Sequence, residues 1–186
     1  MKTRVIIRIF SVVAISISLG FLSEVDAQRH KHHNKHRNAP HQHYSKLPKW
    51  GFSISSAPKK AVVIKQAGTK YHFYSGVYYK HVGNKYKVVK APIGVRVKTL
   101  PGERIAVKVK GKKYFYYYGT FYAKASNSNE YMVVAAPLGA KVNALPQGYK
   151  EVNKSGVRYY NFEGVLYKEV ATADDEIWYE VIEVKS

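Results

Sequence analysis

Apolar and polar residues alternate along several segments of this chain. In Val107-Lys108-Val109-Lys110 and in Tyr86-Lys87-Val88, each apolar side chain is followed by a lysine or preceded by one. A period of two places the apolar groups on one face of a β-strand and the lysines on the other. No window shows a sustained 3.6-residue apolar period with helix caps, so the pattern predicts an all-β fold.

A pair of glycines with seven residues between them occurs three times, and aromatic residues lie within and after each pair. The pairs are Gly68 and Gly76, Gly111 and Gly119, and Gly156 and Gly164. This spacing is typical of a tandem array of one supersecondary unit. Glycine tolerates the positive φ of a tight hairpin, so the six glycines are predicted to lie in turns that flank aromatic strands.

Each repeat therefore predicts a short antiparallel β-meander, and we expect units at about 59–101, 102–146 and 147–186 within an all-β domain of residues 59–186. The first two units end alike, in Ala91-Pro92-Ile93-Gly94 to Pro101 and in Ala136-Pro137-Leu138-Gly139 to Pro146. The third lacks that segment, so we expect a truncated unit that caps the array. Small SH3-like barrels are the alternative, because Gly-x-x-Val-x-x-Leu-Pro resembles the end of barrels of that kind.

The motif Tyr-Tyr-Tyr-Gly-x-Phe-Tyr, followed by Tyr-x-Val-Val-x-Ala-Pro-x-Gly-x-x-Val-x-x-Leu-Pro, carries a family resemblance. It resembles the exported bacterial proteins, common in Bacteroidota, that are grouped as domain of unknown function 6515. The resemblance spans roughly residues 61–186. It implies no activity and no catalytic residues, since that family is defined by sequence alone.

The first 27 residues predict a secretory signal peptide. Lys2, Arg4 and Arg8 precede an uncharged run from Ile9 to Leu22, and Ala27 fits the cleavage position. The run is too short and too rich in Ser and Gly for a membrane span. We therefore expect export to the periplasm, to the outer membrane or to the medium, with no transmembrane segment after processing.

Residues 28–58 are expected to form a disordered basic tail, because Gln28 to His43 alone holds six His and four Lys or Arg. Between Ala27 and Gly102 there are sixteen Lys or Arg and no Asp or Glu, whereas acids gather near the end of the chain. A cationic front attracts polyanions, so the expected partners are an anionic envelope surface or acidic polysaccharide, with no specific nucleic acid. The sequence does not indicate an oligomeric state.

The seventeen tyrosines invite a binding interpretation, since exposed aromatic faces stack on sugar rings. The candidate platform combines aromatic residues with neighbouring lysines: Tyr78, Tyr79, Tyr116, Tyr118, Trp178, Lys80, Lys112 and Lys113. The alternative is that these tyrosines pack against cross-strand neighbours.

The His-rich tail offers candidate metal ligands at Gln28, His30, His32 and His33. Cleavage after Ala27 would place His30 third from a free amine, and that set of nitrogens suits square-planar Cu(II) or Ni(II). A flexible cationic arm is the plainer interpretation, so we expect no dedicated cofactor.

The sequence has no cysteine, no Gly-x-Ser-x-Gly motif and no carboxylate paired with a base. Because these signs of catalysis are missing, we expect a protein that is not an enzyme. The expected function is a structural or adhesive module of the bacterial cell envelope. A polyanion- or glycan-binding protein is the alternative, and a metal-binding tail comes third.

Overall fold

The computed structural model describes residue 40 and residues 42–185. Contacts divide the chain into Met1–Arg37 and Asn38–Ser186, and all the described structure lies in the second unit. The predicted signal peptide and residues 28–39 of the predicted tail lie outside the described residues.

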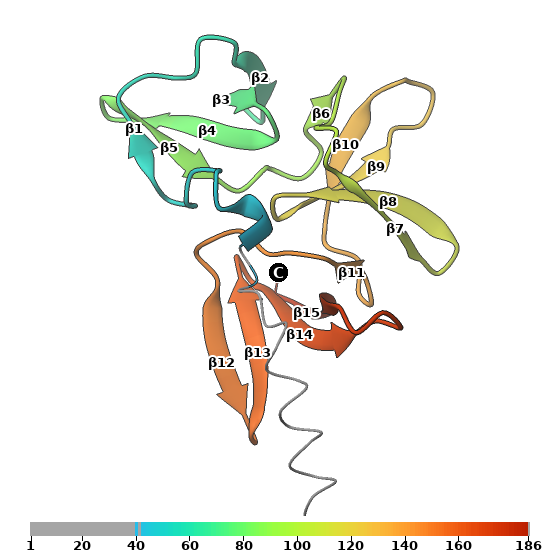
Figure 1. Cartoon of the computed structure of the whole chain (residues 1–186). Helices are drawn as coiled ribbons and strands as arrows, with labels where there is room; N and C mark the ends of the chain where they lie inside the picture. The colour runs from blue at the N-terminus through green and yellow to red at the C-terminus, as the bar shows by residue number, and fades with distance from the viewer. Residues whose placement is uncertain (1–39, 41, 186) are drawn as a thin grey trace, which may run out of the picture. The chain divides into compact units, whose positions relative to one another are not determined.

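The described chain forms a short 3₁₀ helix, η1 (Gln42–Tyr44), and three antiparallel sheets of five strands each (Figure 1). The first sheet has the order β1-β5-β4-β3-β2, with β1 Ser53–Ile54, β2 Val62–Gln66, β3 Thr69–Tyr74, β4 Val77–Val82 and β5 Lys85–Val89. The second sheet has the order β6-β10-β9-β8-β7, with β6 Arg96–Val97, β7 Ile105–Val109, β8 Lys112–Tyr117, β9 Thr120–Lys124 and β10 Tyr131–Val134. The third sheet has the order β11-β15-β14-β13-β12, with β11 Lys141–Val142, β12 Lys150–Lys154, β13 Val157–Phe162, β14 Val165–Ala171 and β15 Ile177–Val184.

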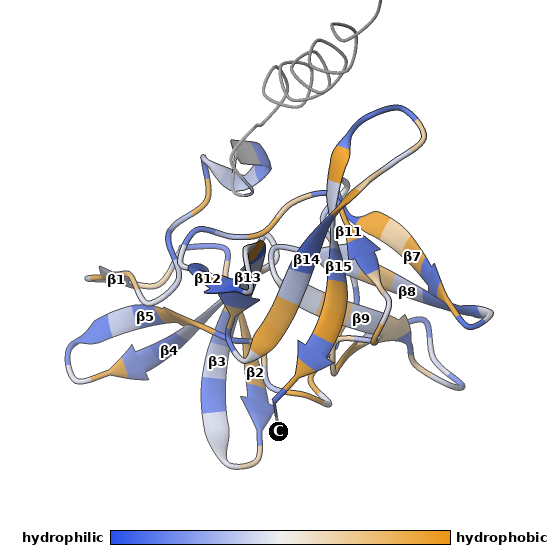
Figure 2. Cartoon of the chain, turned by 90° about the horizontal axis from the view of Figure 1, so that it is seen from below, coloured by the Kyte–Doolittle hydropathy of each residue, from blue (hydrophilic) through white to orange (hydrophobic). Residues whose placement is uncertain are grey.

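The all-β prediction and the tandem meanders are confirmed. None of the three sheets closes into a barrel, so the SH3-like alternative is wrong. Strands β14 and β15 carry hydrophobic and hydrophilic residues in short blocks along their length, and three successive residues at the start of β14 are buried (Figure 2).

In every sheet, two-residue turns join the second strand to the third and the third to the fourth, as they join β2, β3 and β4 in the first sheet. In each turn both central residues have positive φ, as in Ser75 (49°) and Gly76 (82°) or Tyr118 (45°) and Gly119 (76°). Positive φ at both positions defines the type I′ hairpin, whose twist matches that of the flanking strands. The six predicted turn glycines, Gly68, Gly76, Gly111, Gly119, Gly156 and Gly164, all have positive φ.

The recurring Ala-Pro-x-Gly segments begin a sheet, whereas we expected them to end a unit. Gly51 is the equivalent of the glycines in these two segments. Each of the three backbone amides donates a hydrogen bond to the last strand of its own sheet: Gly51 to Val88 at 3.0 Å, Gly94 to Val133 at 2.9 Å and Gly139 to Val181 at 2.8 Å. The short strands β1, β6 and β11 follow directly and pair with the same last strands. The true repeat is therefore shifted toward the N-terminus.

This shift corrects the expectation of a truncated third unit. The third sheet has five strands like the others. An Ala-Pro-x-Gly segment after it would begin a further sheet, so the third sheet is complete without one. The shift also changes the front of the domain. Gly51, Phe52 and β1 belong to the first sheet, whereas the expected tail extends to residue 58.

Successive sheets cover each other through their aromatic faces. Tyr78 and Phe73 of the first sheet pack in one cluster with Tyr122 and Val133 of the second. Tyr116 and Phe121 of the second sheet pack in another cluster with Tyr167 and Val181 of the third. Each open sheet thus buries one face only because a neighbouring sheet lies against it.

The turn glycines form part of both junctions. A Cβ added at Gly76 would lie 2.3 Å from the ring of Tyr117 and 2.9 Å from Pro101. At the equivalent Gly119, it would lie 2.5 Å from the ring of Phe162 and 2.9 Å from Pro146. A ring from the next sheet therefore rests directly on each turn, and only glycine leaves room for it.

The segment before the first sheet, Pro40 and residues 42–50, forms a strap over the second and third sheets. Tyr44 is buried and meets the ring of Tyr118 edge-on at 5.3 Å, and Trp50 meets that of Phe162 at 4.8 Å. Leu145 N–H donates to the Pro40 carbonyl at 2.7 Å. The apolar residues of this segment therefore order it against the core.

The two junctions differ in one hydroxyl. Tyr122 donates to the Tyr78 hydroxyl at 3.3 Å across the first junction. In the second junction Phe121 stands where Tyr78 stands in the first, and the buried Tyr167 hydroxyl has no hydrogen-bond partner among the described residues. A buried polar group without a partner lowers stability by about 1–3 kcal/mol.

Substitution of Gly119 tests the ring-on-turn contact. Gly119→Val introduces both backbone strain and a clash with Phe162. Gly111→Val introduces the strain alone, since no atom in the described part of the chain lies within 4 Å of a Cβ there. We expect Gly111→Val to cost about 1–2 kcal/mol and Gly119→Val at least ~2 kcal/mol more. Thermal melting measures both, and equal losses of Tm would contradict the contact.

The Tyr122 and Tyr167 hydroxyls make a second, matched test. Tyr167→Phe removes an unpaired buried hydroxyl and is expected to raise the free energy of unfolding by about 1 kcal/mol. Tyr122→Phe breaks the bond to Tyr78 and is expected to lower it by about 1 kcal/mol. Urea unfolding of both variants measures these changes, and a loss of stability in Tyr167→Phe would show that this hydroxyl has a partner.

Candidate functional site

The predicted aromatic platform is wrong for four of its five rings. Tyr78, Tyr79, Tyr116 and Tyr118 are at most 5% exposed, so they cannot stack on a ligand. Trp178 is half-buried, and its Nε1 donates to Glu176 at 3.2 Å. Cross-strand and sheet-to-sheet packing, the alternative considered above, accounts for these tyrosines.

The three predicted lysines are exposed, but they do not lie on one sheet. Lys80 belongs to β4 of the first sheet, and Lys112 and Lys113 belong to β8 of the second. The Lys113 amine lies 5.3 Å from the centre of the Phe115 ring. These cations therefore belong to a broader basic surface and form no site with the predicted tyrosines.

All the lysine, arginine and acidic positions of the first sheet, and of the segment that leads into it, are occupied by lysine. Residues 46–90 contain ten lysines and no Asp or Glu. Some of these lysines stand directly opposite one another across strands, as Lys65 does opposite Lys70 and Lys80 opposite Lys87. Like charges in such positions repel, and an anion bound between them would relieve that repulsion.

The third sheet differs in charge. Residues 139–185 contain eight Asp or Glu against six Lys or Arg. Across its strands Lys168 stands opposite Glu180, and Arg158 lies 3.8 Å from Glu151. The same positions of the repeat thus carry balanced charge at one end of the array and unbalanced positive charge at the other.

One face of the first sheet, which we call the leading face, is only partly covered. Its central residues Val77, Tyr79 and Val88 are buried in one core cluster with Tyr44 of the strap, whereas Phe52 and Tyr74 beside them are exposed. Phe52 is 56% exposed, whereas its equivalents Val95 and Ala140 are fully buried. Tyr74 is 41% exposed, whereas Tyr117, its equivalent in the second sheet, is 3% exposed. In the later sheets this face is covered by the preceding sheet.

The leading face also brings together two histidines. The rings of His72 and His81 lie 4.9 and 4.8 Å from that of Tyr86. Sequence reasoning missed this face, because recognising it requires the true start of the repeat at Trp50-Gly51-Phe52. With that start, Phe52 aligns with Val95 and its exposure could have been predicted.

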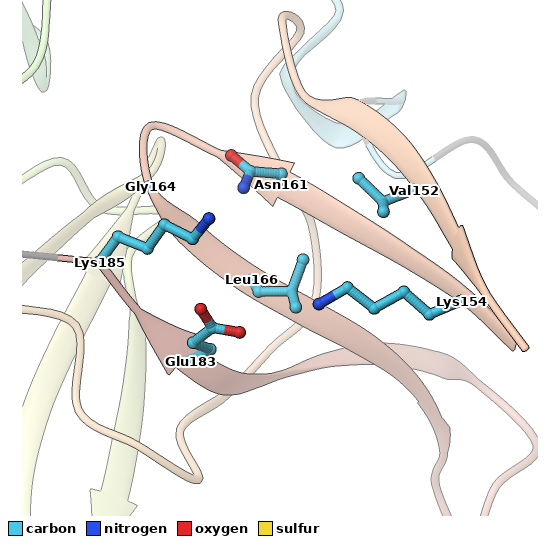
Figure 3. A pocket seen from close by; sticks show the side chains of 7 residues that line it. All are labelled: Val152, Lys154, Asn161, Gly164, Leu166, Glu183 and Lys185. Carbon is cyan, nitrogen blue, oxygen red and sulfur yellow. The ribbon is translucent and has the colours of Figure 1, made fainter.

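A hollow of about 110 Å³ lies on the opposite face of the third sheet (Figure 3). Its lining consists of Val152, Lys154, Asn161, Gly164, Leu166, Glu183 and Lys185. Leu166 lies in the middle of this lining, and the Lys154 amine points toward it. Four of these seven residues are polar or charged, so the hollow is largely polar.

The predicted metal ligands Gln28, His30, His32 and His33 lie outside the described residues. Within residues 42–185, no three His, Cys, Asp or Glu side chains are grouped to hold a metal ion. No helix in that part of the chain is long and apolar enough to cross a membrane.

Burial changes the acid–base behaviour of the tyrosines. Loss of water around the phenol raises the pKa of Tyr44, Tyr78 and Tyr167 well above the usual value, and the pKa of Tyr116 and Tyr122 rises for the same reason. Burial disfavours the charged phenolate, so these groups stay neutral in the folded chain at pH values where they would ionise in water.

The raised pKa values predict alkaline unfolding. In the unfolded chain the tyrosine pKa is about 10, so stability is complete below that pH and falls as pH rises above it. Each tyrosine that is neutral in the folded chain and ionised in the unfolded chain lowers the free energy of unfolding by about 1.4 kcal/mol per pH unit. Tyrosinate absorbance and circular dichroism should change together above pH ~10; ionisation of the buried tyrosines in an intact fold would contradict this.

Comparison with curated proteins and with solved structures gives no significant match. Residues 23–185 match the sequence profile of DUF6515, described as a family of unknown function. The match covers all three sheets and the strap. The chain therefore belongs to DUF6515, a family of unknown function.

Proposed function

We propose that this protein is an exported, non-enzymatic adhesive module of the cell envelope, which attaches to anionic polymers through its first sheet. The observation that supports this most strongly is the set of ten lysines, with no acidic residue, on residues 46–90. Most of the aromatic residues that would suit a sugar-stacking platform are buried in the core and cannot contact a ligand. Charge is therefore the main means of attachment.

The arrangement of the lysines favours an extended ligand over a small one. Lys65, Lys70, Lys80 and Lys87 stand in opposed pairs along strands and are exposed. The two pairs lie on opposite faces of the sheet, so both faces present positive charge without an enclosing pocket. An acidic polysaccharide or another repeating polyanion can contact several of them at once, and each contact releases counterions.

Export and envelope attachment rest on the predicted signal peptide, and the adhesive role rests on the repeat architecture. Three sheets stacked through aromatic contacts form a scaffold in which the faces of the middle sheet are both used for packing. A scaffold of this kind can hold a charged end sheet at a surface.

Retention on immobilised polygalacturonate tests the attachment. The protein should be retained at low salt and released progressively as salt rises, whereas a neutral dextran matrix should not retain it. The double variant Lys80→Gln/Lys87→Gln should elute at clearly lower salt. The matched control Lys150→Gln/Lys154→Gln removes the same charge from the third sheet, near acidic residues, and should elute close to the unchanged protein.

Equal effects of the two double variants would show that only net charge matters and would contradict a role for the first sheet. Retention that is indifferent to salt would contradict attachment by charge altogether.

A further inference from the structure

Two histidines occur in the three sheets, and both lie on the leading face. His72 of β3 stands opposite Tyr79, and His81 of β4 stands opposite Tyr86. The two positions are diagonal neighbours across β3 and β4, so their Cα atoms lie about 7–8 Å apart. The ring of Tyr86 contacts both imidazole rings, at 4.9 Å from His72 and 4.8 Å from His81. The contacts with one tyrosine hold the two histidines side by side.

Two lysines extend this group along the same face. Lys70 precedes His72 by two residues in β3, so both side chains point to the leading face. Lys65 of β2 stands directly opposite Lys70. Lys65, Lys70 and His81 are exposed, and His72 is half-buried. We call these four residues the histidine–lysine cluster.

The strap leaves the histidine–lysine cluster accessible. The buried part of the leading face, Val77, Tyr79 and Val88, shares a core cluster with Tyr44 of the strap. Val77 begins β4 beside the Gly76 turn, whereas His81 lies near the other end of that strand. A long polymer can therefore contact the histidine–lysine cluster while the strap stays in place.

The surroundings of the two histidines contain bases and phenols but few acids. No Asp or Glu occurs in residues 42–90, which include the strap and the whole first sheet. Glu103 lies close to the Gly76 end: after burial, its charge raises the pKa of Tyr117, whose ring rests on Gly76. The other titratable side chains of this face and of the strap are Lys65, Lys70, Tyr74, Tyr79 and Tyr86, and His43, Tyr44, Lys46 and Lys49. A positive charge on either imidazole is thus repelled by lysines, and a bound polyanion would supply the missing negative charge.

The equivalent positions of the other sheets are filled differently. His72 corresponds to Phe115 in the second sheet and to Tyr160 in the third, and His81 corresponds to Glu169 in the third. The Tyr160 hydroxyl donates a hydrogen bond to the Glu169 carboxylate. The third sheet therefore has a paired phenol and carboxylate where the first sheet has two imidazoles. Imidazoles are the side chains that ordinarily gain a charge between pH 8 and 5.

We propose that the histidine–lysine cluster is a second attachment site for acidic polysaccharide, and that it binds more tightly in mildly acidic surroundings. The proposal rests on the attachment to anionic polymers proposed above, and it places a site on the face opposite Lys80 and Lys87. Protonation of His72 and His81 adds positive charge beside the lysines, and the carboxylates of the polymer stabilise that charge. Binding therefore takes up protons, so the affinity rises as pH falls.

Calorimetric titration with an oligogalacturonate at pH ~8 and pH ~5.5 tests the site, on protein purified from cells that produce the full chain. The sugar carboxylates stay ionised at both pH values, since the usual pKa of a carboxyl group is about 4. The unchanged protein should bind more tightly at the lower pH. The variant His72→Phe/His81→Gln should lose about fivefold of this change in Kd, because it cannot form the two new ion pairs. Phe at position 72 is the residue of the second sheet and keeps a ring beside Tyr86.

Two further variants separate the site from the rest of the chain. His32→Gln/His33→Gln removes two histidines that precede the strap in the sequence and lie outside the described residues, and it should keep most of the change in Kd. His81→Lys introduces a charge that is present at both pH values, as Lys124 does at the equivalent position of the second sheet. It should bind more tightly than the unchanged protein at pH ~8 and respond less to acid. Melting temperatures at both pH values should confirm that all variants are folded.

The outcomes distinguish this site from the attachment as a whole. If the unchanged protein binds oligogalacturonate at neither pH, both proposals are wrong. If it binds equally at the two pH values, or if His72→Phe/His81→Gln keeps the full change in Kd, the histidine–lysine cluster is overturned and attachment through other lysines stands. An equal loss in His32→Gln/His33→Gln would likewise overturn it, because two histidines anywhere in the chain would then have the same effect.

Discussion

The structure depends on one constraint, which is that an open five-stranded sheet cannot bury its apolar face alone. Each sheet here presents aromatic rings on a surface that remains wet unless another sheet lies against it. The contact that brings two sheets together is the ring on the turn glycine, as in Tyr117 on Gly76. It combines a backbone conformation that only glycine adopts easily with the close approach that only glycine permits. Turn geometry and sheet stacking are therefore set by the same residue.

This double role explains why the period of the chain could be read from its sequence. The glycine pairs and the aromatic residues between them predict turns, strands and a tandem array, and the positive φ values and three meanders confirm these predictions. The start of the repeat could not be read in the same way. The strands β1, β6 and β11 have only two residues each, too few for a pattern, and their assignment depends on pairing with a strand more than thirty residues later.

The candidate site shows the same limit. Tyr78 and Tyr116 alternate with other residues in strands that carry aromatic groups on both faces, and such a run does not reveal which faces are covered. Burial is a property of the junction between sheets and not of the strand. The lysine distribution, in contrast, needs no knowledge of packing, and the basic front could be predicted from composition alone. The strap was missed because its three packing residues, Tyr44, Leu47 and Trp50, are spread among lysines.

The three sheets share one architecture but have diverged according to what each one touches. The middle sheet has partners on both faces, and Tyr116, Phe121 and Tyr122 are almost fully buried there. The end sheets carry the deviations: lysines without acids in the first, and Asn161 and Leu166 in place of larger rings in the third. A closed monomer would gain stability from polar residues on both outer faces, yet Phe52 and Tyr74 remain apolar and exposed on the leading face. Phe52 and Tyr74 are exposed because, among the described residues, no sheet precedes the first one, and the strap covers only the central residues Val77, Tyr79 and Val88 of this face.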